Sequence, residues 1–304
     1  MNNKHVFKKI LWAFLLVTLT ACGSDPKVDG DISIRAFSLE ARHHGIYLFN
    51  SKANSIEEMR LITPEELGAG YYSWSLDGDK LLFSCQKEEE WSGICRIDKD
   101  GEDFEILLTG DEFIFNPFAL SPDNRLIAFR KFTQTAPRMD SILIYDIEEG
   151  KINELFKFYD VIDSISWSPD GNQLALTINP LEVHILNINT LELKYLTNGY
   201  YPIWSPDGKS IAFTLSGTLK LFSLDEGLLE TIIDPSENHK GICVNGRDGI
   251  TWSHDGEYIA FINSCEEADP NLGLYMVHVD SGKVYQLHDW GSSKGALTQP
   301  VWIP

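Results

Sequence analysis

Positive charge is scarce in this sequence. Lysine and arginine supply 25 side chains against 45 from aspartate and glutamate, so the 304 residues carry a formal net charge of -20. A protein that neutralises nucleic-acid phosphates needs a basic surface, and we therefore expect no nucleic-acid partner. Apolar residues make up 43% of the chain and include eight tryptophans, which is enough for a large core and excludes wholesale disorder.

A long hydrophobic run is also missing. The most apolar stretch, residues 10–19, has about ten residues, well short of the roughly 20 that a membrane-spanning helix needs. It follows three lysines and precedes the small residues Thr20 and Ala21, which is the order of parts in a secretory signal. We therefore predict that residues 1–21 are a signal peptide.

The segment Leu19-Thr20-Ala21-Cys22 resembles the lipobox of bacterial lipoproteins, in which the cysteine thiol receives a diacylglycerol. The resemblance implies that Cys22 is lipidated and that the protein faces the periplasm. Because Gly23 rather than aspartate follows, it also implies delivery to the outer membrane. The alternative is an ordinary signal peptide with an incidental cysteine.

Cleavage before Cys22 would leave the chain more acidic. It removes three lysines and no acid, which gives 22 basic against 45 acidic side chains and a net charge of -23. Acyl chains, at about 0.8 kcal/mol per buried CH₂, rather than a basic patch must then hold the protein on the membrane. Residues 22–31 are polar and predict a tether that reaches at most about 35 Å.

A ten-residue pattern of the type W-S-P-D-G-x-x-I-A-F recurs along the rest of the chain, at intervals of roughly 37 to 50 residues. Its copies begin at Trp74, Leu120, Trp167, Trp204 and Trp252, and a sixth starts at Trp302. A period of this length is typical of the four-stranded blades of a β-propeller.

Each copy predicts a tight hairpin, because Ser-Pro-Asp-Gly favours a type I turn and its flanks alternate apolar and polar residues. Two further strand-like runs follow each hairpin. We expect looser turns where Leu76 and His254 replace proline and where Asn124 replaces glycine.

The two ends of the repeat region complement each other. Residues 32–38, 45–50 and 58–63 predict three strands without an inner partner, whereas residues 299–303 predict one inner strand. Together they make one blade. The sequence therefore predicts an all-β fold over residues 32–304: a six-bladed β-propeller with four antiparallel strands per blade, closed by the C-terminal strand.

The repeats resemble the PD40, or WD40-like, repeat of the TolB propeller over nearly all of residues 31–304. The resemblance implies a six-bladed propeller, a fold that hosts many functions. TolB itself also has an α/β domain ahead of its propeller, and we expect this chain to lack that domain. TolB's own partners, the peptidoglycan-associated lipoprotein and the Tol complex, therefore carry over only weakly.

Cysteine is rare, and four of the five cysteines lie in the repeat region. An even number in an exported protein predicts disulfides. Three pairings are open, and the local one joins Cys85 to Cys95 and Cys243 to Cys265, since each pair flanks loops on the same face. No C-x-x-C spacing is present, so we expect no metal bound by these thiols.

That face of the propeller also carries the longest predicted loops, and binding usually resides on long loops of a rigid scaffold. Five aromatic or arginine side chains would serve there as interface anchors. They are Trp91, Tyr200, Tyr201, Arg247 and Trp290. The alternative is that these side chains only pack the loops.

Motifs for chemistry are missing. No G-x-S-x-G occurs, the histidines share no spacing with a nucleophile, and residues 98–103 resemble a calcium loop without its distal glutamate. We therefore predict no catalytic residue, no metal site and no cofactor.

The predicted function is a non-catalytic, lipid-anchored scaffold that binds a periplasmic protein. The alternative is a ligand- or carbohydrate-binding or enzymatic propeller with its site at the central channel mouth. It requires convergent polar residues at the start of the inner strands.

Overall fold

The computed structural model describes residues 32–38, 43–49, 59–75, 77–87, 90–110, 117–133, 139–179, 181–244, 249–263, 273–289 and 297–303. These residues form 24 β-strands and no helix. The signal peptide, Cys22 and its tether, Arg247, Cys265 and Trp290 lie outside the described residues.

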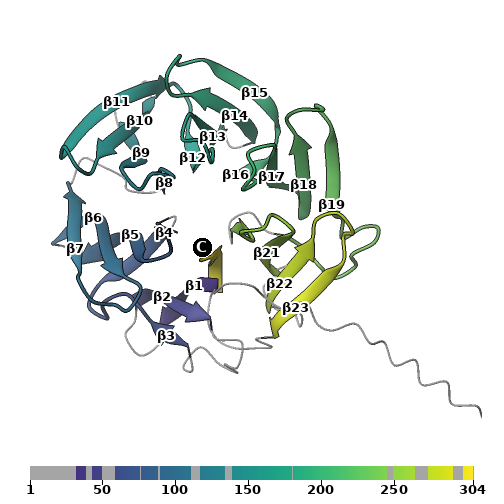
Figure 1. The fold of residues 1–304 in the computed structure, drawn as a ribbon, viewed down its shortest axis with the longest axis horizontal. Helices are drawn as coiled ribbons and strands as arrows, with labels where there is room; N and C mark the ends of the chain where they lie inside the picture. The colour runs from purple at the N-terminus through teal and green to yellow at the C-terminus, as the bar shows by residue number, and fades with distance from the viewer. Residues whose placement is uncertain are drawn as a thin grey trace, which may run out of the picture.

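The strands form six sheets of four antiparallel strands each, arranged in a ring (Figure 1). Blade 1 comprises β4 (Gly68–Trp74), β5 (Lys80–Lys87), β6 (Trp91–Asp98) and β7 (Glu105–Thr109). Blade 2 comprises β8 (Phe118–Leu120), β9 (Leu126–Thr133), β10 (Met139–Asp146) and β11 (Lys151–Phe158). Blade 3 comprises β12 (Ile162–Trp167), β13 (Gln173–Ile178), β14 (Glu182–Asn187) and β15 (Leu193–Asn198).

The chain continues around the ring in the same way. Blade 4 comprises β16 (Tyr200–Trp204), β17 (Ser210–Leu215), β18 (Thr218–Ser223) and β19 (Leu229–Ile233). Blade 5 comprises β20 (Ile250–Trp252), β21 (Tyr258–Asn263), β22 (Gly273–His278) and β23 (Val284–Asp289).

Blade 6 joins the two ends of the described chain. Its inner strand is β24 (Leu297–Trp302), and β1 (Ile32–Ser38), β2 (His43–Phe49) and β3 (Arg60–Leu61) follow outward. Ile32 pairs with Trp302 and Ser33 with Val301. The predicted six-bladed propeller and its closure by the C-terminal strand are confirmed, and closure pairs inner strands that would otherwise expose an edge.

The turns of the repeat are more uniform than the sequence suggests. In all five, the serine carbonyl accepts a hydrogen bond from the N–H three residues on, at 2.9–3.0 Å. The expected loosening is wrong for two reasons. Each serine hydroxyl also bonds the turn aspartate, at 2.5–2.6 Å, and this clamp does not depend on proline. Asn124 adopts the required positive φ of 60°, which asparagine tolerates.

The core lies between the blades. Phe83, Phe129, Phe213 and Phe261, one from each of four copies, are completely buried. The tryptophan before the turn reaches the preceding blade. Trp74 Nε1 donates to Ser33 Oγ at 2.9 Å and Trp167 Nε1 donates to the Ala119 carbonyl at 3.0 Å. The repeated aromatic residues thus pack neighbouring blades together.

Candidate functional site

The inner strands of the six blades surround a channel that contains a cavity of about 640 Å³. The cavity reaches the face of the ring that carries the Ser-Pro-Asp-Gly turns, because Pro122, Pro169 and Pro206 line it. We call this face the S-P-D-G face and the opposite one the long-loop face. A cavity of this size is in the range of ligand and peptide sites.

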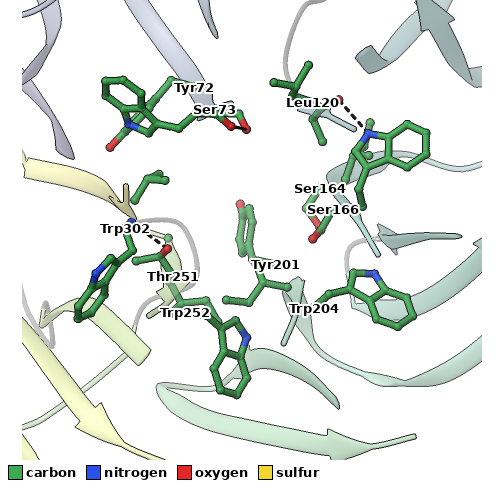
Figure 2. A pocket seen from close by; sticks show the side chains of 18 of the residues that line it. Tyr72, Ser73, Leu120, Ser164, Ser166, Tyr201, Trp204, Thr251, Trp252 and Trp302 are labelled. Carbon is green, nitrogen blue, oxygen red and sulfur yellow. Dashed lines mark hydrogen bonds between the residues drawn. The ribbon is translucent and has the colours of Figure 1, made fainter. Parts of the chain in front are cut away.

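Hydroxyl-bearing and apolar side chains, many of them aromatic, form most of the wall of the channel. One ring of lining residues comes from the position before the repeat tryptophan or leucine in each blade. It consists of Ser73, Ala119, Ser166, Ile203, Thr251 and Val301. Ser73, Ser166 and Thr251 are labelled in Figure 2. Among the described residues, the lining includes no aspartate, glutamate, lysine or arginine. The wall therefore offers hydroxyl groups and apolar surface to an uncharged segment.

Two tyrosines meet across the channel. Tyr71 and Tyr201 stand three positions before Trp74 and Trp204, in blades 1 and 4, which lie opposite each other in the ring. Their side chains are hydrogen-bonded, and Figure 2 shows the Tyr201 ring standing in the channel. Burial raises the pKa of Tyr71 well above its ordinary value, and Tyr201 raises it further. Tyr71 therefore stays protonated to a higher pH than an exposed tyrosine.

The backbone of blade 4 turns Tyr201 inward. The pairing of β16 with β17 shifts register between Tyr200 and Ile203, and Tyr201 adopts a positive φ of 51°, a conformation that costs about 1–2 kcal/mol in a residue with a Cβ. Its N–H donates to Thr177 Oγ1 in blade 3 at 3.0 Å. The contact holds the strained residue in place.

Gly199 makes this path possible. A Cβ at this residue would lie 2.2 Å from the ring of Phe213, so only glycine allows the chain to pass so close to that ring. In the sequence Gly199-Tyr200-Tyr201, the glycine is therefore required by the close approach to Phe213, and the second tyrosine lines the channel.

The predicted interface residues do not all gather at one site. Tyr201 lies in the channel, and the Tyr200 ring stacks on it with centroids 6.4 Å apart. Trp91 is partly buried against the core of blade 1. Arg247 and Trp290 lie outside the described residues. Sequence reasoning missed Tyr71, although its position relative to Trp74 matches that of Tyr201 relative to Trp204.

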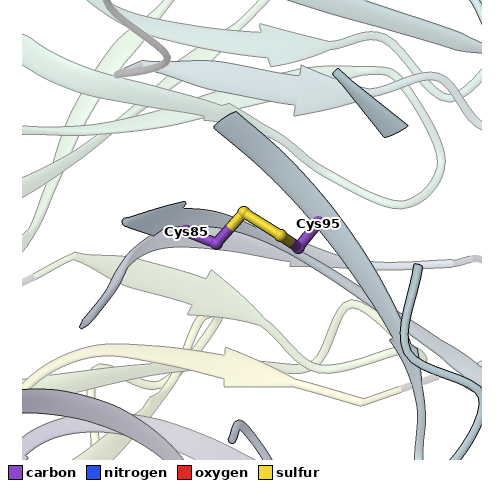
Figure 3. The surroundings of a disulfide bond; sticks show 2 residues. All are labelled: Cys85 and Cys95. Carbon is purple, nitrogen blue, oxygen red and sulfur yellow. A yellow bond between two sulfur atoms is a disulfide. The ribbon is translucent and has the colours of Figure 1, made fainter. Parts of the chain in front are cut away.

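Disulfides stiffen the propeller. Cys85 in β5 and Cys95 in β6 are bonded, with Cα atoms 5.8 Å apart, and both are buried (Figure 3). Cys243 is also disulfide-bonded. Its expected partner, Cys265, lies outside the described residues.

The S-P-D-G face carries fixed negative charge next to the cavity. Hydrogen bonds from the turn serine hydroxyls hold the pKa of Asp77, Asp170 and Asp207 below its usual value, and backbone N–H groups lower it further. These carboxylates stay ionised at neutral pH.

The acidic segment at residues 98–103 is a hairpin turn. Asp98 pairs with Lys80, and the Asp98 carbonyl accepts a hydrogen bond from the Gly101 N–H at 2.8 Å.

The described residues offer neither a metal site nor a membrane-spanning helix. No group of three or more histidine, cysteine or acidic side chains is placed to hold a metal ion. No helix in the same ranges is long and apolar enough to cross a membrane.

Comparisons with known proteins agree with this architecture. The TolB beta propeller domain model matches residues 86–227. TolB from Acinetobacter baumannii has a similar structure over 92% of this chain and 68% of its own, with a TM-score of 0.74 and 15% identity. A putative TolB from Agrobacterium tumefaciens is similar over 91% of this chain and 99% of its own, with a TM-score of 0.59 and 17% identity.

The fold is shared more widely. An oligogalacturonate lyase from Vibrio parahaemolyticus is similar over 83% of this chain and 73% of its own, with a TM-score of 0.57 and 12% identity. No curated protein is significantly similar to the chain. Six four-stranded blades in a closed ring define a six-bladed β-propeller. The chain is therefore a six-bladed β-propeller, and residues 86–227 match the TolB beta propeller domain model.

Proposed function

We propose that this chain is a non-catalytic protein-interaction module of the bacterial envelope, anchored through lipid on Cys22, and that its channel receives a segment of a partner protein. The observation that carries the proposal is the cavity of about 640 Å³, to which all six blades contribute and which reaches the S-P-D-G face. The signal-like residues 1–21 and the lipobox-like sequence before Cys22 support the envelope location.

The wall of the cavity suits a polypeptide better than a charged small molecule. Its hydroxyl groups and apolar side chains fit an uncharged stretch of chain, while the turn carboxylates at the S-P-D-G face suit basic residues that flank such a stretch. The similarity to an oligogalacturonate lyase, at 12% identity, shows a shared fold only. The described lining provides tyrosine and serine hydroxyls rather than a paired acid and base, so no specific observation favours the enzymatic alternative.

In-cell crosslinking followed by purification tests the proposal. Ser166→Phe would fill the channel, whereas Lys194→Phe places the same side chain on the exposed outer strand β15. We expect a partner protein to be recovered with the native chain and with the Lys194 variant, and to be lost with the Ser166 variant. Equal recovery from all three, or no partner above background, would count against a binding channel.

The anchor has its own test. Mass spectrometry of the N-terminal peptide should find acylated Cys22, and a Cys22→Ala variant should leave the membrane fraction. A variant that still sediments with membranes would refute the lipid anchor without bearing on the channel.

A further inference from the structure

We infer that the propeller is oriented on the membrane, with the S-P-D-G face and its cavity toward the lipid and the long-loop face toward the periplasm. The inference rests on the proposed lipid anchor at Cys22. It follows from where the described chain enters the ring and from the short distance along the sequence between that point and Cys22.

The chain enters the ring at the S-P-D-G face. Ile32, the first residue of β1, pairs with Trp302 at the end of β24, and Trp302 occupies the repeat position that directly precedes the turns in the other blades. Ser33 confirms the level, because its Oγ accepts the hydrogen bond from Trp74 Nε1 at 2.9 Å. The polypeptide therefore meets the propeller near the centre of this face, beside the cavity that Trp302 lines.

The sequence between Cys22 and Ile32 is too short to wrap around the ring comfortably. Ten residues span at most about 35 Å when fully extended, and about 18 Å on average as a flexible coil. To bring the long-loop face to the membrane, these residues would have to pass β2 and β3, about 10 Å, and then run the length of the seven-residue β1, about 23 Å. That path takes nearly the whole extended length of the ten residues, without any allowance for a detour around side chains.

The charge of the S-P-D-G face sets how closely it approaches the lipid. Anionic lipid headgroups repel the carboxylates of Asp77, Asp170 and Asp207, and this repulsion extends over about 8 Å at physiological salt. The face therefore lies above the lipid surface rather than on it. The cavity opens into the intervening layer, and a periplasmic segment of a membrane-bound protein is the kind of partner that reaches it there.

Energy transfer from the protein to the membrane tests the orientation. Lys209 and Ser216 are exposed residues directly before and after β17, so a fluorescent amino acid at one reports the S-P-D-G face and at the other the long-loop face of the same blade. The lipidated full chain would be reconstituted in vesicles of phosphatidylethanolamine and phosphatidylglycerol that contain rhodamine-labelled headgroups. We expect clearly higher transfer efficiency from position 209 than from position 216.

A tether variant serves as the matched control. Insertion of about 20 glycine and serine residues between Asp31 and Ile32 should bring the two transfer efficiencies together, because the longer chain no longer restricts the ring. Vesicle flotation separates the two ideas. A native chain that does not float refutes the anchor and the orientation with it. A chain that floats but gives equal transfer from both positions, or more from position 216, refutes the orientation alone.

Discussion

The side chains of Tyr71 and Tyr201 are hydrogen-bonded to each other, and the two residues belong to opposite blades of the ring. They occupy the same position of the repeat, three residues before the tryptophan, where other blades have Pro117, Ser164 and Gly249. The pair spans the channel and limits how far an occupant can enter it from the S-P-D-G face.

Alkaline pH should weaken the fold through this pair. Because burial raises the folded-state pKa of Tyr71 above the unfolded value near 10, its contribution to stability is complete below pH 10 and is lost as the pH rises toward the folded-state pKa. We expect the free energy of unfolding, measured in urea, to fall above pH 10 by up to about 1.4 kcal/mol per pH unit for this group. Tyr71→Phe should show a shallower fall. An identical pH dependence in both proteins would contradict the assignment.

The serine of the turn should contribute more to the free energy of unfolding than the aspartate of the same turn. Ser205 is buried, accepts from the Ser210 N–H at 3.0 Å and donates to Asp207 at 2.6 Å, so Ser205→Ala leaves two groups unpaired and should cost about 1 kcal/mol. Asp207→Asn should cost less at pH 7, because the carboxylate is exposed.

Acid titration checks the role of Asp207 separately. Its pKa is lowered in the folded state, so its contribution is present above pH 4 and is lost as the pH falls through the folded-state pKa. The stability difference between the native chain and Asp207→Asn should therefore vanish in acid. A difference that stays constant from pH 7 to pH 2 would show that the carboxylate charge plays no part.

Gly199→Ala should destabilise the propeller by about 1–3 kcal/mol, a cost typical of overpacking, because the added Cβ would lie 2.2 Å from the Phe213 ring. Gly68 is the matched control. It begins the first strand of blade 1, as Gly199 directly precedes the first strand of blade 4. A Cβ at Gly68 would meet nothing closer than 3.7 Å, so Gly68→Ala should have little effect. Thermal unfolding of the two variants decides the matter, and equal melting temperatures would argue against the close contact.

A buried ion pair between β9 and β10 supports the junction of blades 2 and 3. Arg130 Nε lies 2.7 Å from Asp140 Oδ2, and the same carboxylate accepts from the Ile162 N–H of blade 3 at 2.9 Å. Asp140→Asn removes the charge that balances Arg130 and should cost about 3 kcal/mol or more. Exchange of both residues for apolar ones of similar size should cost less. Urea unfolding of the single and double variants measures the difference, and a harmless single variant would contradict the coupling.

The sequence predicts the blades well because the information is local. Trp204 through Phe213 specifies a turn, its two flanking strands and a buried aromatic pair within ten residues. The other copies specify the same hairpin, with leucine in place of one aromatic residue at Leu120 and Leu176. The closure of blade 6 follows from counting strands at the two ends. Register within a blade is equally local, because turns join strands that pair with their neighbours in sequence.

The site is not local, and the sequence accordingly reveals less of it. Tyr201 reads as a loop residue, but the register shift in β16 and its positive φ turn it into the channel. Its partner Tyr71 is remote in sequence. Arg130 stands where Thr177 and Thr214 stand in other blades, and only the fold shows that Asp140 balances it.

Photo-crosslinking from inside the channel tests the central claim most directly. A benzoylphenylalanine would replace Ser73, which lines the cavity, in cells that express the full-length chain, with the exposed Lys194 of β15 as the control position. We expect a discrete protein adduct from position 73, found in the membrane fraction and reduced by Cys22→Ala, and no adduct from position 194. Adducts that are absent from position 73, or the same from both positions, would contradict a channel that receives a partner protein.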